Sequence, residues 1–119
     1  MDSEDLVRLG ELIQAARKRR EVDMADLREA LRLLGEVTQA TATVADHLRT
    51  EIAPLRKRCT ARGDLLCDDT GEDAEPLLAE VRDRLRRIAD HLEEAGLHAR
   101  RSHIRLRRID VQKRGVDEG

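Results

Sequence analysis

The side chains of this sequence that are best suited to chemistry are two histidines that stand in the same local string. His47 and His91 each occur in Ala-Asp-His-Leu, at 45–48 and at 89–92. An imidazole titrates close to neutral pH, so a histidine can accept a phosphoryl group or relay a proton. The alternative is that both are residues of a charged helix flank, next to the leucine of an apolar seam.

The segment His47-Leu48-Arg49-Thr50, with Pro54 shortly after it, resembles the phospho-accepting helix of sensor histidine kinases. Those kinases place Glu-Leu-Arg-Thr-Pro directly after the histidine, whereas a leucine follows it here, and 119 residues leave no room for an ATP-binding domain. The resemblance implies a histidine phosphotransfer-like helical bundle, which is the second alternative for the function.

Patterns for metal binding and catalysis are missing from the sequence. Cys59 and Cys67 do not form a Cys-x-x-Cys pair, and a calcium loop with Gly71 at its sixth position would have Leu77 in place of the bidentate glutamate. The sequence has no phosphate-binding glycine loop and no nucleophile elbow. We therefore expect a non-enzymatic protein without a cofactor or metal, in which Cys59 packs as a small apolar residue and Cys67 is a loop thiol.

The composition favours a soluble all-α protein. The 119 residues include no Phe, Trp or Tyr, and 40% of them are charged, which is typical of solvated helix surfaces. No apolar run is long enough to predict a membrane span, so no membrane partner is expected. Two cysteines without a secretion signal favour the cytoplasm.

Apolar spacing predicts three helices in a single domain that covers residues 1–119. We expect the helices at about 3–20, 24–60 and 75–111, with an acidic loop at 61–75 and a disordered tail at 114–119. The first helix has one apolar stripe: Leu6, Leu9, Ile13 and Ala16.

The third predicted helix carries the most regular pattern. One line of residues recurs every seven positions and a second follows three residues later: Leu78, Leu85, Leu92, Ala99 and Leu106, then Val81, Ile88, Ala95, Ser102 and Ile109. Such heptads are typical of coiled-coil helices. Because the register survives Gly96, we expect a helix that continues through this glycine.

The second predicted helix has a matching seam, so the two helices are expected to form a long antiparallel coiled-coil-like hairpin with Ile52 opposite Leu85. Two helices alone bury too little apolar surface, and a dimer that forms a four-helix bundle would cover the rest. We expect the dimer or partner interface to contain Leu48, Ile52, Leu55, Leu85 and Ile88.

Charge is distributed unevenly along the chain, with acids in the loop and bases near the other end of the hairpin. The bases that could contact the phosphates of a nucleic acid are Arg17, Lys18, Arg19, Arg20, Arg101, Arg105 and Arg108. The alternative is a solvated helix surface whose arginine stems cover apolar area.

The string Leu-Gly-Glu-Leu-Ile-Gln-Ala-Ala-Arg-Lys-Arg-Arg at 9–20, with Asp26-Leu27 and Glu29-Ala30-Leu31 after it, resembles the opening of repressor-type helix-turn-helix domains. Here Glu21 stands in place of the turn glycine, and no separate recognition helix is expected because the second helix runs on. The resemblance implies a small DNA-associated protein, which is the first alternative.

These observations favour a non-enzymatic helical adaptor or assembly protein that homodimerises and binds an unidentified protein. Acidic side chains such as Glu11 and Glu21 lie among the bases and dilute their field, which is why nucleic-acid binding ranks second.

Overall fold

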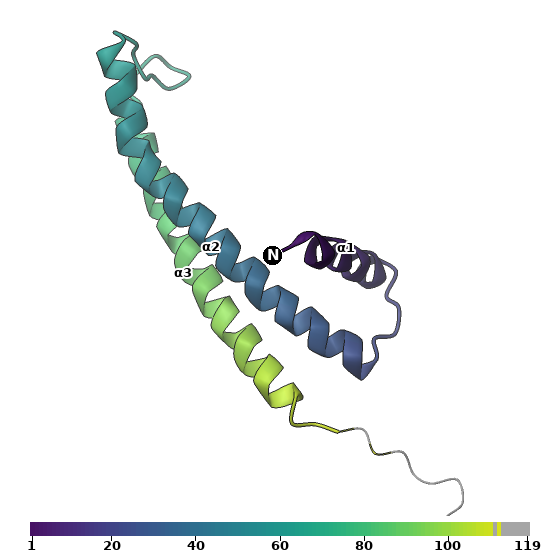
Figure 1. The fold of residues 1–119 in the computed structure, drawn as a ribbon. Coiled ribbons are helices and arrows are strands. Elements are labelled where there is room, and N and C mark those ends of the chain that lie inside the picture. Colours follow the sequence, from purple (N-terminus) through teal and green to yellow (C-terminus); the bar gives the residue numbers. More distant parts are fainter. Residues whose placement is uncertain (111, 113–119) are drawn as a thin grey trace, which may run out of the picture. The chain divides into compact units, whose positions relative to one another are not determined.

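The computed structural model describes residues 1–110 and 112, and it is all-helical as the composition predicts. Three helices follow one another: α1 (Ser3–Arg17), α2 (Met24–Ala61) and α3 (Glu75–Leu106) (Figure 1). The described residues form no strand beyond a single antiparallel bridge between Cys67 and Asp73. α2 and α3 pack as a hairpin, which confirms that part of the predicted fold class, while dimerisation stays a prediction.

The chain divides into two compact units. The first contains Met1–Val37 and the described residues from Ala95 on, and the second contains Thr38–Glu94. α2 and α3 each contribute to both units, so each unit holds an antiparallel pair of helical segments. We call the second unit the hairpin arm.

α1 ends at Arg17, three residues before the predicted boundary at 20. The amide of Arg20 donates to the carbonyl of Ala15 (3.0 Å) and that of Arg19 to Ala16 (3.1 Å), the hydrogen-bond pattern of a Schellman motif. Arg19 is in the left-handed region with φ 50°. The chain reverses its twist at this residue, and the helix cannot continue.

The ends of the other helices agree more closely with the prediction. Asp23 caps α2 by accepting from the amide of Asp26 at 2.7 Å, and Asp73 accepts from that of Glu75 at 3.0 Å at the start of α3. α3 continues through Gly96, as the register predicted, and ends at Leu106, short of the predicted 111. There the amides of Arg108 and Ile109 bond three residues back, a tighter turn than the α-helix. The predicted tail at 114–119 lies outside the described residues.

In the first unit, α1 is held against α2 by ion pairs. Asp5 lies 2.7 Å from Arg32, and Arg8 pairs with Asp26. The residues of α1 that are half-buried are Asp5, Arg8, Leu9, Leu12 and Ala15, and none is fully buried. The contact face is thus rotated by about one residue from the predicted stripe, because the ion pairs orient the helix, and Leu6 and Ile13 remain exposed.

The helical pair of the first unit approaches closely at a glycine. A Cβ placed on Gly35 of α2 would lie 3.8 Å from the Cβ of Ala99 in α3 and 3.4 Å from the Cγ of Arg100. Leu33 nearby is the one large side chain that is fully buried in the described part of the chain. Small residues at the contact let two backbones approach, at the cost of a thin core.

Candidate protein–protein interface

The two helices of the hairpin arm also meet through small side chains. The buried residues of the arm are Thr38, Ala42, Ala45 and Ile52 on α2 and Ala89 on α3. On α2 they are spaced by four, three and seven residues, which places them on one face of that helix. The larger residues of the predicted seams lie beside this line, so the contact is rotated by about one position from the predicted one.

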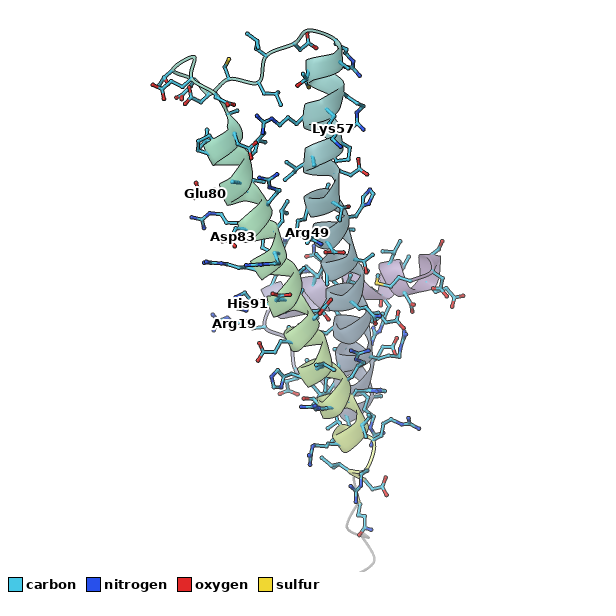
Figure 2. All side chains as sticks on the ribbon, turned by 90° about the vertical axis from the view of Figure 1, so that its left-hand side faces the viewer. Arg19, Arg49, Lys57, Glu80, Asp83 and His91 are labelled. Carbon is cyan, nitrogen blue, oxygen red and sulfur yellow. The ribbon has the colours of Figure 1, made fainter. Side chains whose placement is uncertain are left out.

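One edge of this contact is polar. Glu75 at the start of α3 pairs with Arg56 of α2 and with Arg82 of its own helix, the latter at 2.8 Å. Both arginines are half-buried. Glu80 and Asp83 point away from α2 (Figure 2). These side chains are paired with opposite charges or are in contact with solvent. This side of the arm therefore does not need to be buried by a partner.

The opposite edge of the contact is apolar and open. Six large residues there are exposed over about half of their surface: Val44, Leu48 and Leu55 on α2, and Leu77, Val81 and Ile88 on α3. On each helix the spacings are four and seven residues, which align the side chains along the axis. Because the helices are antiparallel, both lines turn to the same side of the arm. We call these six residues the apolar face.

A groove of about 280 Å³ lies in the middle of this face. It is lined by Leu48, Glu51, Ile52, Leu55, Arg58, Val81 and Leu85. Ile52, which is only 8% exposed, belongs to the buried contact as well. The side chains of Glu51 and Arg58 approach to 3.9 Å, and both remain partly open to solvent. An apolar groove with a charged rim is the form in which a helix face accepts another helix.

The structure brings four of the five predicted interface residues to this groove, namely Leu48, Ile52, Leu55 and Leu85. Ile88 is half-exposed on the apolar face but is absent from the groove lining. Three residues of the groove lining were not predicted from the sequence: Val81, Glu51 and Arg58. Val81 stands in the second heptad line and could have been included, whereas the two charged residues could have been found from their seven-residue spacing on one side of α2.

The predicted phosphate-binding residues all belong to the first unit. Arg17, Lys18, Arg19, Arg20, Arg101, Arg105 and Arg108 are exposed, and within residues 1–110 and 112 none of them forms an ion pair. Arg28 and Arg32, by contrast, are engaged: Arg28 donates to the carbonyl of Ile109, and Arg32 pairs with three acids. Four of these seven bases are consecutive, from Arg17 at the end of α1 to Arg20.

The loop between α2 and α3 is organised by one acid. The carboxylate of Asp68 accepts from the hydroxyl of Thr70 at 2.6 Å and from the amides of Thr70 and Glu72. These hydrogen bonds favour the charged carboxylate and so hold the pKa of Asp68 below its usual value. The bond from the Thr70 hydroxyl has the largest effect. A pocket of about 350 Å³ lies beside it, lined by Arg56, Thr60, Asp64, Leu65, Leu66, Cys67 and Asp73.

The side chains best suited to chemistry are two histidines and two cysteines. His47 and His91 are exposed on separate helices, and Cys59 and Cys67 are free thiols. Across residues 1–110 and 112, no cluster of three or more His, Cys, Asp or Glu side chains is arranged to hold a metal ion. None of the described helices combines the length and apolarity needed to cross a membrane.

Comparison with known proteins returned no matching family model, no matching curated protein and no matching solved structure.

Proposed function

We propose that this protein is a non-enzymatic helical adaptor or assembly protein that homodimerises through the apolar face of its hairpin arm. The observation that carries the proposal is that this face exposes six large apolar side chains, whereas the contact between the two helices uses mainly alanine and threonine. A contiguous exposed apolar patch with a charged rim is typical of a protein–protein interface.

The size of the arm suits a dimer. Its α2 segment begins at Thr38 and ends at Ala61, which corresponds to a length of about 36 Å. Two helices packed about 10 Å apart present a face about 20 Å wide, hence on the order of 700 Å² per copy. Specific interfaces bury roughly 1,200–2,000 Å² in total, and two such faces together, about 1,400 Å², fall within this range.

Analytical ultracentrifugation at micromolar concentration tests the proposal. The wild-type protein is expected to sediment as a dimer, and Leu48→Ser combined with Val81→Ser is expected to yield a helical monomer, because both side chains line the groove. Leu65→Ser is the matched control, since Leu65 is 87% exposed in the loop, outside the face. A wild-type protein that stays monomeric throughout this range contradicts the proposal.

A second candidate, binding of nucleic-acid phosphates, is favoured by one observation in the first unit. Arg19 lies at φ 50° in the Schellman motif that ends α1. It lies among four consecutive exposed bases.

Titration with duplex DNA at several salt concentrations tests this second candidate. Binding through phosphates weakens steeply with salt, and Arg101, Arg105 and Arg108 replaced together by Gln should then weaken it equally for all sequences. DNA affinity that is absent at low salt removes this candidate.

A further inference from the structure

Two opposite charges hold equivalent places within the apolar face of the arm. Glu51 lies between Leu48 and Leu55 on α2, three residues after the first and four before the second. Arg84 has the same spacing between Val81 and Ile88 on α3. Leu48, Leu55, Val81 and Glu51 border one groove, and Arg84 lies one turn from Val81 on α3, where it pairs with Glu80 of its own helix at 2.9 Å. Their exposure is high, with 45% for the Glu51 side chain and 71% for that of Arg84.

A second copy can cover this face in two ways that keep the helices aligned and the dimer closed. If the two-fold axis runs along the helices, α2 faces the partner's α3 and both loops lie at the same end. If the axis runs across the helices, α2 faces the partner's α2 and the loops lie at opposite ends. The apolar residues allow both, since Leu48 meets the partner's Ile88 in the first arrangement and the partner's Leu55 in the second.

The charges distinguish between the two arrangements. With the axis along the helices, Glu51 lies at the height of the partner's Arg84. With the axis across the helices, the same apolar register sets Glu51 against the partner's Glu51 and Arg84 against the partner's Arg84. Unlike charges attract and like charges repel more strongly as an interface excludes water.

We propose that two copies pair side by side with their loops at the same end, α2 of one arm on α3 of the other, and that Glu51 and Arg84 select this arrangement. The proposal rests on the proposed homodimer and adds its orientation. Each dimer then contains two equivalent pairs of Glu51 with the partner's Arg84. The two acidic loops come to the same end of the dimer, where they present one joint acidic surface.

A charge exchange tests the role of the two residues. Glu51→Arg alone and Arg84→Glu alone each place like charges in both equivalent pairs and should weaken the dimer about tenfold, while the double variant should restore the wild-type dissociation constant. Arg86→Glu is the matched control, because Arg86 lies on the far side of α3 from the apolar face. Equal dissociation constants for the wild type, both single variants and the double variant overturn the charge selection.

A distance between the two copies tests the orientation directly. Cys59→Ser leaves Cys67 as the one thiol for a nitroxide spin label, and the dimer holds two labels. With the loops at the same end, the two labels lie at the same height along the dimer, and their separation should stay below about 30 Å. With the axis across the helices it should exceed about 30 Å, because the ten residues from Glu51 to Ala61 rise about 15 Å in each copy.

The outcomes separate the two proposals. A monomer at all concentrations contradicts the proposed function. A dimer whose labels at Cys67 lie beyond about 30 Å leaves the homodimer intact and overturns the orientation.

Discussion

The carboxylate of Asp5 in α1 lies 2.7 Å from the guanidinium of Arg32 in α2, and this contact connects two helices that share little apolar surface. Arg32 also pairs with Glu29 at 2.6 Å and with Glu36 at 3.0 Å. No residue of α1 is buried. The attachment of α1 to the first unit therefore depends on charge more than on a core.

Acid should release α1 from α2. The hydrogen bond from Arg32 holds the pKa of Asp5 below its ordinary value of 3.8 and that of Glu29 below 4.5. A lowered pKa in the folded state stabilises the contact at pH values above the ordinary pKa, and this stabilisation is lost as the pH falls through the folded-state pKa. The protection factors of the α1 amides, which are corrected for the pH dependence of intrinsic exchange, should therefore fall below about pH 4.

Asp5→Asn provides the comparison for this prediction. It removes the charge that titrates, so the protection factors of the α1 amides should be lower at neutral pH and should change less with acid. Asp46→Asn, which removes an ion pair within α2 at 2.7 Å from Arg49, should leave α1 exchange as it is. Protection of α1 that stays constant down to pH 2 contradicts the assignment.

Arg19→Gly should stabilise the protein. Glycine adopts φ 50° without a steric penalty, whereas the left-handed conformation costs an L-residue about 1–2 kcal/mol. The larger entropy of glycine in the unfolded chain offsets part of this, and we expect a gain of about 0.5–1 kcal/mol in urea unfolding. Arg19→Ala keeps the strain and should show no gain. Equal unfolding free energies for the two variants would show that strain at this position is negligible.

Gly35→Ala should also stabilise the protein, although Gly35 is buried at the helix contact. The added Cβ would meet Ala99 and Arg100 at ordinary contact distances of 3.8 and 3.4 Å. Replacing a glycine inside a helix by alanine contributes about 0.5–1 kcal/mol. Gly35→Leu should instead be destabilising, by about 1–3 kcal/mol, because the side chain would displace α3. A loss of stability in the alanine variant, measured by thermal unfolding, would show that the two backbones lie too close together to accept a Cβ at residue 35.

The two thiols should differ in reactivity. Cys67 is exposed in the loop and Cys59 is half-buried on α2, which agrees with the predicted order of accessibility. A thiol reagent should therefore label Cys67 first under native conditions. In denaturant the two rates should become similar. Faster native labelling of Cys59 contradicts the placement of that residue.

Much of the helical architecture follows from the sequence, because it depends on local spacing. Heptads that persist from Leu78 to Leu106 predict one long helix, and Asp23 is a capping residue directly before an apolar period. The same periodicity placed Leu48, Ile52, Leu55 and Leu85 on one side of the hairpin, and the structure brings them to one groove. The single domain, the dimer and the partner stay predictions.

Only the tertiary structure decides which part of each apolar stripe is buried. A stripe spans about 100° of a helix, and two helices in contact use only a part of it. In the arm the part with Ala45 and Ala89 is used, because small side chains allow close approach, and Leu48 and Val81 stay open. In α1 the pair of Asp5 and Arg32 turns the helix by about one residue, which leaves Leu6 exposed. Spacing along a sequence defines a stripe, but the direction in which it faces depends on size and charge in the neighbouring helix, which lies far away in the sequence.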